Sequence, residues 1–342
     1  MKKICLVGET RAGHGPPMAG RLVKRQLAAA LAGAVWLCSP ATQAVILQEV
    51  CAFGGDWRDE LVQGLDGHFY GTTQRGGSTD KGTIFRVTTN GVLTPLVSFT
   101  GTNGEFPWAG LMRARDGNFY RTTTYGGANG LGTVFRVTPG GALTTLAQFN
   151  GADGAFPTAV LLEGQDGLFY GTTIRGGVED PGTVFRLSTN GDLTALASFP
   201  AMVLNSYTSP LVQDDDGNLY GITSAGGANE AGQVFMVTTN GAFTTLASFT
   251  GIGTMGQAPC AGLVHCRDGN LYGTTYWGGG SGPFAGRGTV FKITRSGALS
   301  TVKSFTGSNG AYPVARLLEM AQPFPGEATI KALSSGSAPR ER

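Results

Sequence analysis

A unit of fifty residues recurs five times along the chain, and this repeat restricts the possible folds more than any other feature. Asp-Gly pairs are spaced by 50, 50, 50 and 52 residues and begin at Asp66, Asp116, Asp166, Asp216 and Asp268. Each pair is followed by an aromatic run such as Phe169-Tyr170-Gly171, then by a Gly-Gly corner and by two further runs with Phe at matching places. Because a fixed period of this length is typical of repeat architectures, we expect five copies of one supersecondary unit.

Each unit contains four short runs of strand-forming residues bounded by turn residues. In the second unit, the predicted strands are Ala109 to Arg113, Asn118 to Thr124, Thr133 to Thr138 and Ala142 to Phe149. Many of the 56 glycines fall between these runs, where tight turns need positive φ angles. Short connections force antiparallel neighbours, so each unit predicts a four-stranded sheet, and a ring of such sheets can cover its own faces. The sequence therefore predicts an all-β fold, a β-propeller of five four-stranded repeats, with a linear solenoid as the alternative.

The two ends of the repeat region look like parts of one further unit. Val45 to Phe53 resembles a fourth strand without its predecessors, and Val314 to Met320 resembles a first strand without successors. Unpaired strand edges favour a partner, so we expect these two segments to meet at a seam of the ring. We expect the propeller to span residues 45–320. Residues 321–342, rich in Ser, Ala, Pro and charged residues, predict a disordered tail.

The first 44 residues predict a secretory signal peptide with an over-extended start. Arg21, Lys24 and Arg25 precede an apolar stretch from Leu27 to Cys38, and small residues follow up to Ala44. Met18 is placed where such a signal normally begins. Retention of this segment as a membrane anchor is the alternative, although its apolar stretch is short for a bilayer span. We therefore expect a secreted or extracellular protein without membrane insertion after signal removal.

Charge and cysteine content narrow the classes of partner. Removing residues 1–44 takes away six of 25 basic and one of 23 acidic residues, which leaves 19 against 22. A slightly acidic chain without a basic run gives no electrostatic footprint for nucleic acid. Three cysteines remain, and Cys260 and Cys266 flank one predicted strand, too far apart for a mutual disulfide. Cys51 could form a disulfide with either of them. We also expect the protein to be a monomer.

The repeat resembles a known bacterial family. The unit Asp268-Gly-Asn-Leu-Tyr-Gly-Thr-Thr, followed by Gly-Gly, by Gly-Thr-Val-Phe and by a run such as Leu-Thr-Thr-Leu, is similar to the repeat of the choice-of-anchor tandem-repeat GloVer-containing proteins. The likeness covers residues 45–320. It implies an exported, cell-surface or extracellular repeat protein of unassigned activity, often with a C-terminal sorting anchor. Residues 321–342 show no hydrophobic anchor helix, so the resemblance does not extend to surface attachment.

The sequence indicates no catalytic centre, metal site or cofactor. Only His68 and His265 follow the signal, without metal-ligand spacing, and no nucleophile elbow is present. The acidic run 214–216 favours a solvated turn, with a calcium site as the alternative. The repeated Asp of each Asp-Gly pair is interpreted as a turn former. One repeat position is occupied by arginine in three units, at Arg86, Arg136 and Arg186. We expect these side chains to pack along a neighbouring sheet rather than to bind an anionic polymer.

Variation between the repeats is concentrated on one face. The loops between the second and third strands share this face with the links between units, and they vary most. The candidate ligand-binding residues on this face are Arg75, Trp108, Tyr125, Arg175, Tyr276 and Trp277. Exposed aromatic rings there could stack on sugars or anchor a protein, or they could instead plug the channel and cap adjacent blades.

These observations lead to a secreted or cell-surface scaffold that binds a polysaccharide or a cell-surface protein through this loop face. The alternative is a polysaccharide hydrolase or lyase with acidic residues in a central funnel, which requires a non-repeating carboxylate pair with a raised pKa. A spacer that only extends from the cell is a third possibility.

Overall fold

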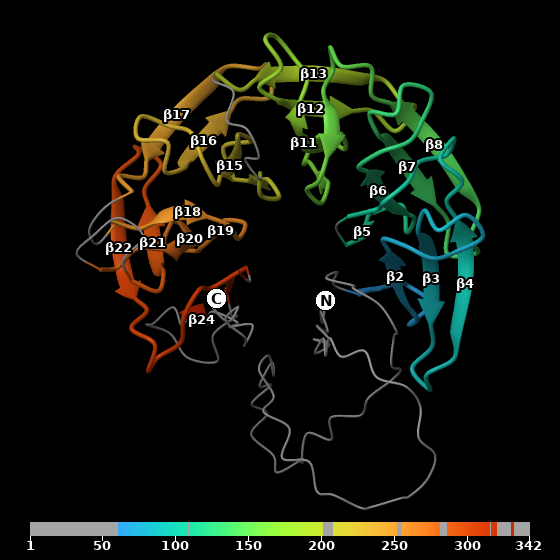
Figure 1. The fold of residues 1–342 in the computed structure, drawn as a ribbon, viewed down its shortest axis with the longest axis horizontal. Coiled ribbons are helices and arrows are strands. Elements are labelled where there is room, and N and C mark those ends of the chain that lie inside the picture. The colour runs from blue at the N-terminus through green and yellow to red at the C-terminus, as the bar shows by residue number, and fades with distance from the viewer. Residues whose placement is uncertain are drawn as a thin grey trace, which may run out of the picture.

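The described residues form five β-sheets of four or five strands, arranged around a common centre, and one further two-stranded sheet, as the computed structural model shows (Figure 1). The structure describes residues 61–108, 110–200, 208–251, 255–280, 286–314, 316–319 and 330–331. The sheets follow each other along an arc rather than along a line. This arrangement confirms the propeller and excludes the linear solenoid. Among the described residues, no helix is long and apolar enough to cross a membrane.

Each sheet, or blade, is an antiparallel meander whose strands follow chain order from the centre outward. The strands of blade 1 are β1 (Val62–Gln63), β2 (Phe69–Thr73), β3 (Thr83–Val87) and β4 (Leu93–Ser98). Those of blade 2 are β5 (Met112–Arg113), β6 (Phe119–Thr123), β7 (Thr133–Val137) and β8 (Leu143–Gln148). Those of blade 3 are β10 (Leu162–Glu163), β11 (Phe169–Arg175), β12 (Thr183–Leu187) and β13 (Leu193–Ser198).

The last two blades repeat this order. Blade 4 contains β14 (Val212–Gln213), β15 (Leu219–Thr223), β16 (Gln233–Val237) and β17 (Phe243–Ser248). Blade 5 contains β19 (Val264–His265), β20 (Leu271–Trp277), β21 (Thr289–Ile293) and β22 (Leu299–Ser304). Two links between blades also form strands, β9 (Ala155–Pro157) and β18 (Gln257–Pro259). The strands of blade 2 lie where the sequence predicts them, except that its innermost strand is shorter.

The core lies between the blades. One face of blade 1, with Tyr70, Ile84 and Phe99, packs on Phe119 and Phe135 of blade 2. The Tyr70 and Phe119 rings are 4.2 Å apart between centroids, and the equivalent Tyr120 and Phe169 rings are 4.3 Å apart. The aromatic residues that define the repeat therefore join each sheet to the next.

The C-terminal end begins a further sheet beside blade 5. Strand β23 (Leu318–Glu319) lies next to β19 and pairs with β24 (Ile330–Lys331). Leu317 is buried against Val264 and Val290 of blade 5. The region expected to act as a first strand therefore lies beside blade 5, as the first strand of a further unit would. Its partner among the described residues is β24, which lies in the segment predicted to be a disordered tail. The other expected seam strand, Val45 to Phe53, lies outside the described residues, as does the predicted signal peptide.

Candidate functional site

The corner after the second strand of each blade is held by a threonine, which is buried in blades 2 to 5 and half-buried in blade 1. The hydroxyl of Thr123 donates to the carbonyl of Tyr125 at 2.9 Å, and it accepts a hydrogen bond from the amide of Thr133 at 3.1 Å. The same contact to the corner carbonyl recurs in the other blades, from Thr73 to Arg75, Thr173 to Arg175, Thr223 to Ala225 and Thr275 to Trp277. The corner backbone is therefore fixed by the repeat, and only the corner side chain varies.

The links between blades are clamped to the blades on both sides. The amide of Phe106 donates to the carbonyl of Lys81 in blade 1, and the Glu105 amide donates to the carbonyl of Tyr125 in blade 2. Phe106 has a φ of 50°, and the equivalent residues Phe156, Ala258 and Tyr312 have φ values of 55°, 50° and 51°. A non-glycine residue in this left-handed region costs about 1–2 kcal/mol, so the clamps must hold it there. The conformation recurs in these four links, after blades 1, 2, 4 and 5, so it belongs to the architecture.

Links and corners together build a row from blade 1 to the link before blade 3. We call it the aromatic row, and it consists of the Arg75 guanidinium and the rings of Phe106, Tyr125 and Phe156. The Arg75 guanidinium lies 5.4 Å from the centroid of the Phe106 ring. The Phe106 and Tyr125 rings meet edge to face at 6.0 Å, and Tyr125 lies 5.2 Å from Phe156. The Tyr125 side chain is 43% exposed, so the centre of the row faces solvent.

Two other predicted residues lie beside the aromatic row. Trp108 follows Phe106 in the same link and is 41% exposed. Arg175 is the corner residue of blade 3, and its backbone pairs with Ala155, the neighbour of Phe156. The structure thus brings four of the six predicted residues, Arg75, Trp108, Tyr125 and Arg175, to one stretch of the loop face.

The remaining two predicted residues form a separate cluster in blade 5. Tyr276 stacks on Tyr312 with 5.1 Å between centroids, and Trp277 meets Tyr312 edge to face at 5.0 Å. Tyr276 and Trp277 are half-buried by these contacts. Blade 4 separates this cluster from the aromatic row, because the small residues Ala225 and Ala258 stand at its corner and at the next link.

Phe156 and Tyr312 were not predicted as site residues, although each supports rings that were. The available signal was the repeated residue-Pro step of the links, Phe106-Pro, Phe156-Pro, Ala258-Pro and Tyr312-Pro. Aligning these steps shows that three of four carry an aromatic ring. The contact between a link ring and a corner ring depends on the fold and could not be inferred from spacing alone.

The opposite ends of the strands carry a repeated Asp–Tyr pair. Asp166 accepts the Leu168 amide at 3.1 Å, as expected of a turn former, and also the Tyr170 hydroxyl at 2.6 Å. Burial, together with the hydrogen bond to Asp166, raises the pKa of Tyr170. The equivalent tyrosines, whose pKa values the same two causes raise to about 12, are Tyr70, Tyr120, Tyr220 and Tyr272.

The predicted arginine row belongs to these pairs. Arg86, Arg136 and Arg186 lie on the strand next to the tyrosine, directly across from Tyr70, Tyr120 and Tyr170. Blade 4 has Met236 at this position, across from Tyr220. The arrangement agrees with a structural role in the sheets.

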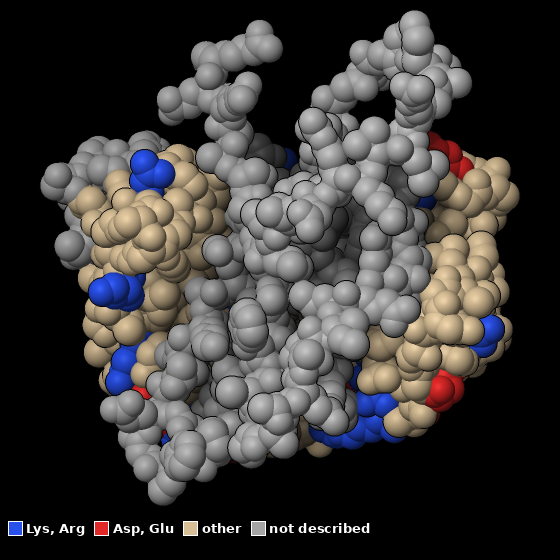
Figure 2. All heavy atoms as spheres, turned by 90° about the horizontal axis from the view of Figure 1, so that it is seen from below, with Lys and Arg blue, Asp and Glu red and all other residues tan. Residues whose placement is uncertain are grey.

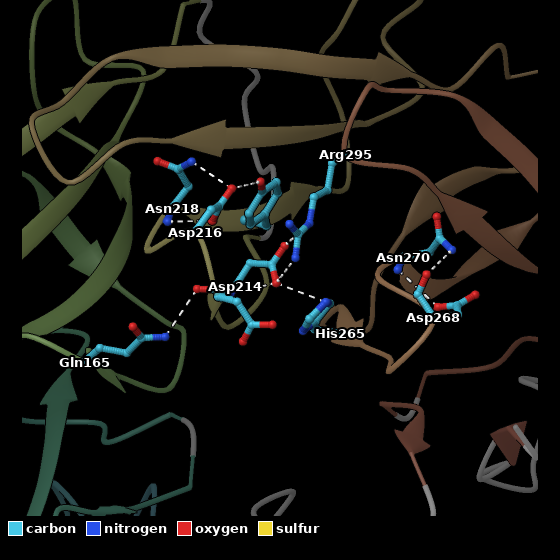
Figure 3. A network of polar contacts seen from close by, with 10 residues as sticks. Gln165, Asp214, Asp216, Asn218, His265, Asp268, Asn270 and Arg295 are labelled. Carbon is cyan, nitrogen blue, oxygen red and sulfur yellow. Dashed lines mark hydrogen bonds and ion pairs between the residues drawn. The ribbon is translucent and has the colours of Figure 1, made fainter. Parts of the chain in front are cut away.

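Asp214 of blade 4 contacts two residues of blade 5 (Figure 3). Arg295 donates from Nη2 to Asp214 Oδ1 at 2.8 Å, and its Nε lies 2.5 Å from Oδ2. His265 Nε2 lies 3.0 Å from Oδ1 of the same carboxylate. The Asp214 side chain is fully buried, so the prediction of a solvated turn at 214–216 is wrong for this residue. The reason is that the turn of blade 5 that carries Arg295 covers it.

The fold and these sites define a repeat protein of the β-propeller type. The chain belongs to the Gloeobacter/Verrucomicrobia repeat family, whose model matches residues 28–209 and 206–331. This match confirms the resemblance inferred from the repeated motif. No curated protein matches the sequence.

Several solved structures share the arrangement of strands at low sequence identity. A putative 6-phosphogluconolactonase from Bacteroides uniformis is 17% identical, with a TM-score of 0.46 over 77% of this chain and 74% of that one. A protein of unknown function from Dyadobacter fermentans is 11% identical, with a TM-score of 0.45 over 73% and 82%. A gluconolactonase from Xanthomonas campestris is 16% identical, with a TM-score of 0.42 over 65% and 68%.

Proposed function

We propose that this protein is an exported scaffold that binds an uncharged polysaccharide through the loop face of blades 1 to 3. The observation that carries the proposal is the aromatic row, in which Tyr125 is exposed on a clamped backbone, together with the exposed Trp108 of the Phe106 link. Rings held in fixed positions offer apolar faces to sugar rings at little entropic cost. The row extends from the corner of blade 1 to the link before blade 3, which suits an extended ligand rather than a single sugar.

The charges beside the aromatic row favour a neutral ligand. Arg75 pairs with Asp80 at 3.4 Å, Arg175 pairs with Asp180 at 3.2 Å, and Lys81 pairs with Glu105 at 2.5 Å. Because each of these cations has a nearby carboxylate, these pairs give the loop face no net positive charge that would attract an acidic polysaccharide. On the side of the ring drawn in Figure 2, which is an edge view and not a view onto the loop face, basic and acidic side chains are likewise scattered among uncharged ones on the described surface.

Two alternatives fit the contacts less well. A hydrolase or lyase requires a non-repeating acid held in a protected site for proton transfer, whereas Asp214, the buried non-repeating acid, is bound by Arg295. A protein partner would also use exposed rings, but protein interfaces usually combine them with a large apolar core. The described exposed apolar side chains, such as Leu65 and Val178, are scattered instead.

The proposal is tested by screening the protein on an array of neutral and uronic-acid polysaccharides, followed by titration of the best ligand. We expect binding to a neutral glycan with little dependence on salt concentration. Tyr125→Ala and Trp108→Ala should each weaken binding about tenfold, as for an aromatic hot spot. Leu65→Ala is the matched control, because Leu65 is 77% exposed in the turn between β1 and β2, at the strand ends opposite the aromatic row. Selective binding of acidic glycans, or equal affinity of all three variants, would refute the proposal.

Export is part of the same proposal and has its own test. Sequencing the N-terminus of material from the culture medium should show that residues up to about Ala44 have been removed. Secreted material that still begins at Met1 or Met18 would contradict it.

A further inference from the structure

Three residues that break the repeat meet at one point between blades 4 and 5. The three are Asp214, His265 and Arg295, and each occupies a position that carries a different residue in the other blades. At the position of Asp214, the other units have Gly64, Ala114, Gly164 and Cys266. At the position of His265 they have Gln63, Arg113, Glu163 and Gln213, and at that of Arg295 they have Thr89, Pro139, Thr189 and Thr239. The framework therefore forms without this combination in every other blade.

The position of His265 has a structural role elsewhere, which His265 does not repeat. Glu163 accepts the amide of Arg115 in the preceding blade at 2.9 Å, and Gln213 accepts the amide of Gln165 at 2.7 Å. His265 instead directs Nε2 at the Asp214 carboxylate. The two atoms are in ion-pair contact at 3.0 Å, but their geometry does not make a hydrogen bond. An imidazole nitrogen that faces a carboxylate oxygen in this way is placed as two ligands of one cation are.

A second carboxylate completes the cluster. Asp215 is exposed, and one of its oxygens, one Asp214 oxygen and one His265 nitrogen all lie within 4.8 Å of one another. The Asp215 amide donates to Asp214 Oδ1 at 2.7 Å, which fixes the Asp214 carboxylate relative to the Asp215 main chain. One imidazole and two carboxylates are a donor set for a borderline divalent transition metal rather than for calcium, which prefers oxygen alone.

We propose that Asp214, Asp215 and His265 bind a divalent transition metal of the Zn²⁺ class. Arg295 then acts as an outer partner, because it holds the Asp214 carboxylate through its own nitrogens. Three protein ligands leave coordination positions for water or for an oxygen of a small ligand. The site lies at the strand ends opposite the aromatic row, so it does not depend on the proposed glycan binding.

The other blades supply variants that the framework already tolerates. His265→Gln gives this position the residue type that blades 1 and 4 have there, Gln63 and Gln213. Asp214→Ala gives its position the residue type that blade 2 has there, Ala114. Isothermal titration of the metal-stripped protein with Zn²⁺ should give one site, and each variant should lose about tenfold or more in affinity. His68→Gln is the matched control, because His68 lies in blade 1 outside the cluster, and it should bind as the unaltered protein does.

Two further measurements separate this site from other outcomes. Asp215→Asn alters only an exposed side chain, so weaker binding in this variant cannot be attributed to misfolding. Co²⁺ in place of Zn²⁺ should give visible bands without a thiolate charge-transfer band, because no cysteine belongs to the cluster. Absence of a stoichiometric site, a thiolate band, or affinity that is unchanged in both His265→Gln and Asp215→Asn would overturn the proposal.

Discussion

Gly132 is a residue where adding a single methyl group should have a large effect on both stability and the loop face. It precedes β7, has a φ of 101°, and its carbonyl accepts the Phe149 amide at 3.0 Å. A Cβ atom built on Gly132 would lie 2.5 Å from the carbonyl oxygen of Thr123 and 2.9 Å from Cδ of Pro157. Both neighbours belong to the frame of the loop face, since Thr123 fixes the Tyr125 corner and Pro157 follows Phe156.

The cost of Gly132→Ala can be worked out from two contributions. A left-handed φ in an L-residue costs about 1–2 kcal/mol. Forcing a methyl group against a backbone oxygen and a proline ring adds about 1–3 kcal/mol, the usual range for overpacking. We therefore expect the free energy of unfolding to fall by about 2–5 kcal/mol, which corresponds to about 1 M in the urea midpoint at a slope near 3 kcal/mol per M.

Two nearby glycines separate these contributions. Gly130 has a φ of 71°, but no atom lies within 4 Å of the place that an added methyl group would take, so Gly130→Ala should cost the conformational part alone. Gly140 has no left-handed φ, and its nearest neighbour would be Thr138 Oγ1 at 3.8 Å, so Gly140→Ala should be neutral or slightly stabilising. Urea unfolding followed by circular dichroism measures all three. If Gly132→Ala loses no more stability than Gly130→Ala, the close approach does not constrain the loop face.

Three further outcomes are expected. The raised pKa values of the repeated tyrosines mean that the folded state holds these protons more tightly, so stability should be complete below pH 10 and should fall as the pH rises through about 12, measured by urea midpoints at each pH. Thr123→Val should cost about 1–3 kcal/mol, because it leaves the buried amide of Thr133 without its acceptor, and it should weaken glycan binding through Tyr125, which titration would show. The double change Tyr276→Ala and Trp277→Ala should lower the thermal midpoint, because both rings pack on Tyr312, yet leave glycan affinity unchanged; a loss of affinity would place the site in blade 5.

The fold could be predicted because the same pattern of strand and turn residues occurs in all five units of the repeat. The positions of Phe135 and Gly141 predicted a strand and its turn, and the equivalent residues in the other units agreed. The aromatic face was predicted for the same reason, since Tyr125 differs from its repeat partners on an otherwise regular loop.

Contacts that join different blades could not be predicted in this way. Asp214 looked like part of a solvated acidic run, because its cover, Arg295, lies 81 positions later in the chain. The Tyr170 hydroxyl bonded to Asp166 was also missed, although the two residues are only four apart. A turn former needs no partner of that kind, so spacing alone gave no reason to expect one.

The clamped links have a consequence for how such a chain diversifies. The position of Phe106 is set by main-chain hydrogen bonds to Lys81 and to residues of blade 2, and Ala258 keeps the same backbone conformation without a ring. Duplicating a unit therefore also duplicates this fixed backbone position, and the side chain there can change while the blade keeps its fold. Exchanging Ala258 for Phe and Ala225 for Tyr should extend the aromatic surface into blade 4. A ligand long enough to span this surface would then gain contacts without any change in the backbone.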